Sequence, residues 1–280
     1  MHADMDALTS ATLKHLRERW WNDEFTEFLA ETLRPRAGNR ILDVGCGEGT
    51  GEISIGRLHV SQLQLVGIDL VVGKAIAART ATAGHNMRAR FAAGDACRLP
   101  FKDAVFDSTY CVAVLQHIRD VEAATGELAR VTVAGGRVVA VEPDNAARYF
   151  YSSTPWGRRA SQVAAQFFAA LANGRGDTTD PSIGPKLPAI FARHGIEPID
   201  VRLFPVPEVQ LGALPDEIWA ARRTRVESAV SRATTPDVQT LGHEYLVVLD
   251  AYRSEAEQAG ASFIEIQNTM LFATVGQRSD

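Results

Sequence analysis

Cysteines and long apolar runs are scarce in this chain, and each scarcity excludes a class of protein. There are three cysteines among 280 residues, and Cys46, Cys97 and Cys111 form no C-x-x-C pair and have no nearby histidine at metal-ligand spacing. We therefore expect neither a disulfide framework nor a metal site. No apolar run approaches the roughly 18 residues of a membrane-spanning helix. A membrane partner is therefore not expected.

Charge of one sign is not concentrated either. The chain has 29 basic and 34 acidic side chains and a formal net charge of -5, and these charges are interspersed along the sequence. Because phosphate neutralisation supplies most of the affinity for nucleic acid, the sequence predicts no nucleic-acid partner. The amino terminus also lacks the basic start and apolar stretch of a secretory signal, so a cytoplasmic location is the expectation.

Short apolar runs alternate with helical patterns through the middle of the chain. The predicted strands are residues 41–44, 63–68, 87–92, 106–112 and 137–141, and the predicted helices between them are 49–58, 72–83 and 120–131. Repetition of strand, helix and strand gives right-handed crossovers and a parallel sheet covered on both faces. We therefore predict an α/β fold with a doubly wound sheet, which binds ligands at the carboxyl ends of its strands.

The segments around this alternation are interpreted as helical additions. Residues 1–36 are predicted to form an amino-terminal helical cap, because apolar residues recur at helical spacing from about Asp6 to Leu33. Residues 37–280 would form the main domain, with cap insertions at about 144–181 and 212–261. We interpret the first of these as an insertion and not as a second domain. A helix at 185–194 and a strand around 199–204 are predicted between them.

The strongest local motif is ILDVGCGEGTG at residues 41–51, which ends the first predicted strand and opens a helix. Its glycines allow a sharp turn and a close approach of the backbone to a ligand. The nicotinamide or flavin pattern G-x-G-x-x-G would require glycine where Thr50 stands. Asp43, just before the glycines, would repel a pyrophosphate and favours a ligand that carries an ammonium group.

This motif resembles the first motif of the class I methyltransferases, an acid followed by G-x-G-x-G. Other motifs follow in the order of that family. Residues 66–70, VGIDL, resemble the second motif, whose acid accepts hydrogen bonds from both ribose hydroxyls. Residues 94–96, GDA, resemble the third motif, whose acid accepts from the adenine amino group. Residues 106–117 and 127–136 resemble the fourth strand and the approach to the fifth. The resemblance covers residues 40–142 and is to small-molecule enzymes of the type 11 group.

The resemblance implies a fold, a cofactor and a set of binding residues. The family has a seven-stranded, mostly parallel sheet with an antiparallel last strand, for which residues 269–275 are the candidate. The implied cofactor is S-adenosylmethionine, with S-adenosylhomocysteine as the product and no metal. The residues implied to bind it are Asp43, Gly45, Cys46, Gly47, Asp69, Leu70, Asp95, Ala96, Cys111 and Val112.

The implied reaction is methyl transfer to oxygen, nitrogen or carbon of a small organic acceptor. Because the sulfonium already activates the methyl group, positioning supplies much of the catalysis and a base is optional. His117 is the candidate base, although it could instead donate to a backbone carbonyl. Glu142 is a second candidate, and it could equally be a solvated acid or one with no role toward the cofactor.

Aromatic side chains in the predicted caps suggest an apolar or aromatic acceptor, such as a specialised or quinone-like metabolite. The candidate acceptor contacts are Trp20, Tyr149, Tyr151 and His243. Two alternatives remain: a nicotinamide-dependent oxidoreductase, in which Asp69 would bind ribose equally well, and a non-catalytic protein that kept the fold and binds the cofactor. The sequence leaves open whether the protein is a monomer or a homodimer.

Overall fold

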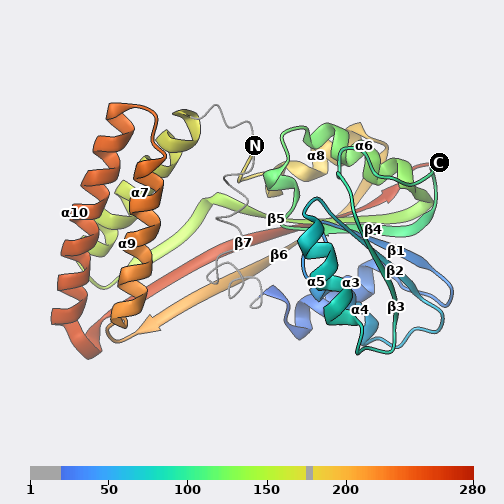
Figure 1. Cartoon of the computed structure of the whole chain (residues 1–280), viewed down its shortest axis with the longest axis horizontal. Coiled ribbons are helices and arrows are strands. Elements are labelled where there is room, and N and C mark those ends of the chain that lie inside the picture. Colours follow the sequence, from blue (N-terminus) through green and yellow to red (C-terminus); the bar gives the residue numbers. More distant parts are fainter. Residues whose placement is uncertain (1–19, 175–178) are drawn as a thin grey trace. The chain divides into compact units, whose positions relative to one another are not determined.

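The computed structural model describes residues 20–174 and 179–280 (Figure 1). These residues form two compact units. Unit 1 comprises the described residues up to Ala146, together with 179–206 and 270–280, and unit 2 comprises the described parts of 147–178 and 207–269. The part of the predicted amino-terminal cap before Trp20 lies outside the described residues.

A seven-stranded sheet has the strand order β3-β2-β1-β4-β5-β7-β6 in the described chain. The strands are β1 (Arg40–Val44), β2 (Gln64–Asp69), β3 (Arg88–Ala93), β4 (Phe106–Val112), β5 (Thr132–Ser152), β6 (Ile196–Leu211) and β7 (Ile264–Arg278). Strand β1 pairs in parallel with β2 and β4, while β3 and β5 extend this parallel set on either side. The last strand, β7, is antiparallel (Figure 1). The predicted fold is therefore confirmed.

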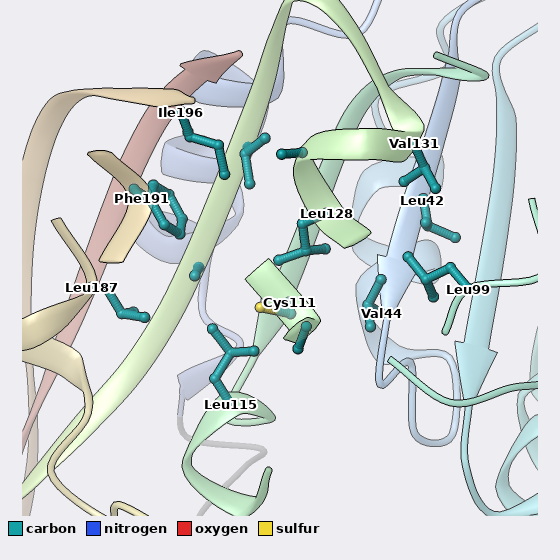
Figure 2. Packing of buried hydrophobic residues seen from close by; sticks show 14 of the residues in the cluster. Leu42, Val44, Leu99, Cys111, Leu115, Leu128, Val131, Leu187, Phe191 and Ile196 are labelled. Atoms are coloured by element: carbon teal, nitrogen blue, oxygen red, sulfur yellow. The ribbon is translucent and has the colours of Figure 1, made fainter. Parts of the chain in front are cut away.

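Alternation along the strands of unit 1 separates two cores. Leu42 and Val44 of β1 face one buried cluster, which includes residues of α6 (Val121–Val131) and α8 (Leu187–Arg193). Figure 2 shows the packing of this cluster around Cys111, Leu115 and Leu128. Since successive strand residues point to opposite faces, Ile41 and Asp43 point the other way. Ile41 joins a second cluster.

The second cluster covers the face of the sheet on which α3 (Asp23–Leu33) and α4 (Thr50–Gly56) lie (Figure 1). Helix α3 begins where the side chain of Asn22 accepts a hydrogen bond from Phe25 N at 2.9 Å, which satisfies one of its free amino-terminal donors. Phe25 and Phe28 then place their rings in the cluster. Helix α5 (Val72–Thr82) contacts β2 and β3.

Three strands are much longer than their apolar signals. The sequence predicted residues 137–141, 199–204 and 269–275, whereas β5, β6 and β7 extend well beyond those limits. The extensions of β5 contain Pro143, Asp144 and Asn145, residue types that are depleted in strands. In the sheet β5 lies between β4 and β7, neighbours that a local sequence pattern does not record.

Unit 2 contains helices α7 (Pro155–Gly174), α9 (Asp216–Ser231) and α10 (Pro236–Ala259). They share a buried cluster that includes Phe167, Val226 and Val248. Gly242 of α10 allows a close approach, because a Cβ there would lie 2.3 Å from a methyl carbon of Val230 in α9 and 2.9 Å from the ring of Phe167 in α7. Whether these helices act as a cap stays a prediction. Within the described ranges, none of the helices combines the length and apolar character that crossing a membrane requires.

Candidate functional site

The glycine loop turns sharply between β1 and α4. Gly45 N and Cys46 N both donate to Ile68 O, at 2.6 and 3.0 Å. Gly45 has a φ of 80°, and a Cβ at this position would lie 2.3 Å from a methyl carbon of Val114. Gly47 also has a positive φ, of 55°, but nothing lies within 4 Å of a Cβ built there. Gly45 is therefore required for packing, while Gly47 leaves open space above the loop.

Asp69 connects the glycine loop to the end of β2. Its Oδ2 accepts from Gly47 N at 3.0 Å and its Oδ1 accepts from Val71 N at 2.9 Å. Because each carboxylate oxygen has a second lone pair, both oxygens can still accept a hydrogen bond from a ligand. The side chain is 8% exposed. Asp69 can therefore hold the loop and accept from a ligand at the same edge of the sheet.

Asp95 lies just beyond β3, beside the end of β2. Gly94 N donates to Asp69 O at 3.0 Å, which connects the two strand ends. Asp95 is exposed, and its Oδ1 accepts from Cys97 N at 2.9 Å. Leu70 is 65% exposed, and Ala96 is half-buried. The two carboxylates and these apolar groups thus share one edge of the sheet, where the sequence predicted ribose and adenine contacts.

Asp43 lies deeper than the other two acids. It is in register with Gly67 on one side and with Tyr110 on the other, so it stands two register positions before the end of β2. Its side chain is 4% exposed. Burial raises the pKa of Asp43 to about 7, and the charge of Asp69 adds to this effect while the nearby Tyr110 hydroxyl opposes it.

Two buried polar residues beside Asp43 were not predicted from the sequence. Glu52, in the first turn of α4, is 1% exposed, and neither of its carboxylate oxygens has a hydrogen-bond partner among the described residues. Burial and the charge of Asp43 raise the pKa of Glu52 well above its usual value. Tyr110 is fully buried in β4. They were not predicted because a glutamate after a glycine loop is typical of a solvated helix residue, and a tyrosine in an apolar strand is typical of the core.

The cysteines of the predicted site are buried thiols. Burial, followed by the charges of Asp43 and Glu52, raises the pKa of the Cys46 thiol far above its usual range. The side chain of Cys111 is completely buried in the core cluster of Figure 2, so its thiol is not accessible to a ligand. Val112 is half-buried. Neither thiol has the environment of a nucleophile.

Glu142 supports the turn that carries His117. It is completely buried, which excludes the interpretation of a solvated acid. Its Oε1 accepts from Val114 N and Leu115 N, each at 2.7 Å, and burial raises its pKa to about 7 against the effect of these bonds. His117 is exposed at the end of the short 3-10 helix η1 (Leu115–His117). The role of His117 as a base stays a prediction.

The candidate acceptor contacts are divided between the units. Trp20 belongs to unit 1, where it packs against the second cluster. Tyr149 and Tyr151 belong to unit 2, are 56% and 42% exposed, and are two residues apart on β5, so they point to the same face of that strand. His243 is exposed on α10. Their role in acceptor binding stays a prediction.

Comparison with known families gives this geometry a context. Residues 42–140, which include the glycine loop, Asp69, Asp95 and the turn before His117, match the family model of a methyltransferase domain. Over these residues the chain is similar to a methyltransferase domain, in agreement with the resemblance predicted from the ordered motifs.

Named relatives match about half of the chain. A demethylmenaquinone methyltransferase of Mycobacterium marinum is 33% identical over 135 residues, which are 48% of this chain and 53% of the relative. A 27-O-demethylrifamycin SV methyltransferase of Amycolatopsis mediterranei is 32% identical over 145 residues, with the same two shares. The chain thus spans about half the length of these relatives.

Solved structures support the fold of the methyltransferase domain. A putative methyltransferase from Bacillus halodurans superimposes with a TM-score of 0.57 at 15% identity, over 92% of this chain and 100% of the other. The phosphoethanolamine N-methyltransferase 2 of Haemonchus contortus, solved with S-adenosyl-L-methionine, gives a TM-score of 0.53 at 17% identity, over 98% of this chain and 60% of the other. At these identities the likeness concerns the fold.

Proposed function

We propose that the methyltransferase domain binds S-adenosylmethionine and transfers its methyl group to oxygen, nitrogen or carbon of a small organic acceptor. The observation that carries this proposal is the shared edge formed by Gly47, Asp69 and Asp95. There the loop has open space above Gly47, and two carboxylates on neighbouring strands can still accept hydrogen bonds. The relatives named as methyltransferases support the same activity.

The residues of this edge fit an adenosyl cofactor. Asp69 would accept from the ribose hydroxyls, and Asp95 with Ala96 would hold the adenine, while the backbone at Gly47 can approach the methionine portion without a side chain in the way. The cofactor supplies a methyl group already activated by a sulfonium. The task of the chain is then to orient two reactants and keep water away from them.

Proton transfer would depend on the turn after β4. Should the acceptor lose a proton, we assign the base to His117, and Glu142 fixes the turn that positions it through Val114 N and Leu115 N. Glu142 is a positioning residue in this proposal, because its carboxylate is already used by the backbone.

For the acceptor, we propose an apolar or aromatic molecule such as a quinone-like or specialised metabolite. The relatives are named for demethylmenaquinone and demethylrifamycin, and unit 2 exposes Tyr149, Tyr151 and Trp156. Within unit 2, these side chains and His243 are the proposed acceptor contacts, and in unit 1 the proposed contact is Trp20. A cytoplasmic location and a monomeric or homodimeric state belong to the same proposal.

Transfer is tested by incubating the full chain with methyl-labelled cofactor and a panel of quinols, phenols, amines and carboxylates. The proposal expects labelled product with at least one acceptor and binding of S-adenosylhomocysteine in calorimetry. Binding without product from a broad panel would favour a non-catalytic binder. Binding of NADH in place of the adenosyl ligands would favour the oxidoreductase.

An Asp69→Asn variant tests the edge itself. The amide nitrogen would face a backbone N–H where a carboxylate oxygen now accepts, so we expect affinity for S-adenosylhomocysteine to fall by about 10- to 100-fold, from the loss of a charged hydrogen bond. The matched control is Asp23→Asn, which removes an exposed acid of α3 and should leave the affinity unchanged. If both variants bound S-adenosylhomocysteine with equal affinity, Asp69 would not be part of the cofactor site.

A further inference from the structure

A row of buried polar groups lies beneath the glycine loop in unit 1. Asp43 of β1 is in register with Tyr110 of β4 and with Gly67 of β2. Since Gly67 has no side chain, Glu52 of α4 occupies the space over it, and a Cβ at Gly67 would lie 2.5 Å from Glu52 Oε1. The row therefore consists of Glu52, which lies over Gly67, followed by Asp43 and then Tyr110.

Gly51 completes the enclosure on the helix side. A Cβ at Gly51 would lie 2.4 Å from Tyr110 Oη, 2.8 Å from Asp43 Oδ2 and 3.1 Å from the ring of Trp21. Two glycines, one on β2 and one on α4, thus provide the room for this row. Such matched omission of side chains indicates a shaped site and not a packing defect.

No positive charge of the described residues compensates this row. The titratable groups that act on Glu52 and Asp43 are each other, Tyr110 and Asp69, and the nearby Cys46 thiol in turn feels their negative charge. On the remaining sides the row meets the ring of Trp21, before α3, and that of Phe91 on β3. Both oxygens of Glu52 lack a hydrogen-bond partner in the described chain, while the Tyr110 hydroxyl lies beside Asp43.

Two buried carboxylates without a cation do not both stay ionised. Desolvation disfavours each charge, and the second charge is disfavoured further by the first, so the pair retains a proton. The unbonded oxygens of Glu52 remain a costly arrangement even then, because a buried acceptor without a partner loses its hydration. A ligand that brings positive charge to the loop above would relieve this cost.

We propose that Glu52 and Asp43 together form the counter-charge for the cationic form of the cofactor, retaining one proton in its absence and releasing that proton to solvent when the cation binds. This inference rests on the proposed function. Glu52 is then a residue that determines cofactor specificity by charge, acting through the glycine loop. Burial places the pKa of Asp43 at about 7, so the exchange falls near neutral pH.

The consequence is discrimination between cofactor and product. S-adenosylmethionine carries one more positive charge than S-adenosylhomocysteine, at the sulfur. S-adenosylhomocysteine keeps the ammonium group of the cofactor but lacks the sulfonium charge, so it stabilises the second charge of the pair less and the pair retains more of its proton. Affinity for the cofactor should therefore rise with pH relative to affinity for the product, by up to about 10-fold per pH unit while one proton is exchanged.

Calorimetry in buffers of different ionisation enthalpy tests this directly, because it counts the protons released on binding. With the wild-type chain near pH 7, we expect S-adenosylmethionine to release more protons than S-adenosylhomocysteine, by about half to one proton per site. Equal release with both ligands would overturn the inference. Failure to bind either ligand would instead contradict the proposed function, so the two failures are distinguishable.

The variant Glu52→Gln tests whether the released proton comes from this row. Without the second acid, the ammonium group that both ligands carry is sufficient to keep Asp43 ionised in both complexes, so we expect the difference in proton release to vanish and the cofactor-to-product affinity ratio to change less than about 2-fold from pH 6 to pH 8. Any ionisation of the ligands themselves is common to both proteins. The matched control, Glu27→Gln, removes an exposed acid of α3 and should behave as the wild type. A Glu52→Gln protein that keeps the wild-type difference would overturn the inference.

Discussion

Two buried glutamates, one in each unit, show opposite solutions to the same problem. Glu265 of β7 is 2% exposed and accepts from Arg222 through both guanidinium NH2 groups at 2.6 and 2.9 Å, and the side-chain amide of Gln267 donates to it at 2.8 Å. Burial alone would raise its pKa, but Arg222 and the Tyr252 hydroxyl hold the pKa below its usual value. Glu52 is equally buried and has neither a cation nor a hydrogen-bond partner in the described chain.

The difference separates structural from functional burial of charge. Glu265 is neutralised by residues of its own unit, and Arg222 is further held by the ring of Trp219, whose centroid lies 5.0 Å from the guanidinium carbon. Such a closed network stabilises a fold and has little capacity left for a ligand. Glu52 keeps its full hydrogen-bonding capacity unused. A buried acid of this kind lowers stability, which is typical of functional sites.

The largest effect is expected from breaking the network of Glu265. Arg222→Met keeps most of the aliphatic packing but leaves a buried carboxylate without its cation, so we expect the free energy of unfolding to fall by about 3–5 kcal/mol. Urea denaturation followed by circular dichroism measures this loss. The double variant Arg222→Met with Glu265→Met removes both charges and should recover most of it. A loss below about 1 kcal/mol in the single variant would show that Glu265 does not depend on Arg222.

For Glu52 we expect the opposite change in stability, an increase when its carboxylate is removed. Because its pKa in the folded chain lies above the ordinary value of 4.5, the cofactor-free protein loses stability as pH rises from that value towards the raised one. Glu52→Gln removes this loss, so the variant should exceed the wild type by about 1–3 kcal/mol at pH 8 and by much less at pH 5. Thermal unfolding of the cofactor-free proteins at both pH values checks it. If the variant were less stable than the wild type at pH 8, Glu52 would be a structural acid, as Glu265 is.

The smallest effect on stability is expected at the exposed acid. Asp95→Ala removes one turn hydrogen bond at the surface, so the free energy of unfolding should change by less than about 0.5 kcal/mol. Affinity for S-adenosylhomocysteine should still fall, by about 5- to 10-fold, as one hydrogen bond to the ligand is lost. Calorimetry measures the affinity and urea denaturation the stability. A large loss of stability with unchanged affinity would assign Asp95 a structural role.

The sequence predicted those parts of the molecule that depend on local pattern. Strands β1 to β4 agree with the predicted strands to within one residue at every end, because their apolar runs are short and bounded by turns. Asp69 and Asp95 were found because strand ends in a parallel sheet meet at one edge. The long strands β5, β6 and β7 were underestimated because they extend well beyond the apolar runs from which they were predicted.

The buried row of Glu52, Asp43 and Tyr110 could not be predicted from local sequence patterns, for a different reason. Glu52 and Gly67 are separated in sequence, and only the packing of α4 on β2 brings the glutamate over the glycine. A charged residue in a helix is usually solvated. The depth of Asp43 likewise follows from the register of β1 against β2, which no motif records. The depth of an acid relative to the strand ends therefore has to come from the structure.

Hydrogen–deuterium exchange with and without S-adenosylhomocysteine tests the central claim most directly, because it locates the ligand without presuming an acceptor. The account predicts slower exchange on binding at the glycine loop of residues 45–49, at Leu70 and Val71 after β2, and at residues 95–97 after β3, with the rest of β1 to β3 unchanged. Binding that slows exchange elsewhere and leaves all three of these segments unchanged would contradict a cofactor site at the carboxyl ends of these strands.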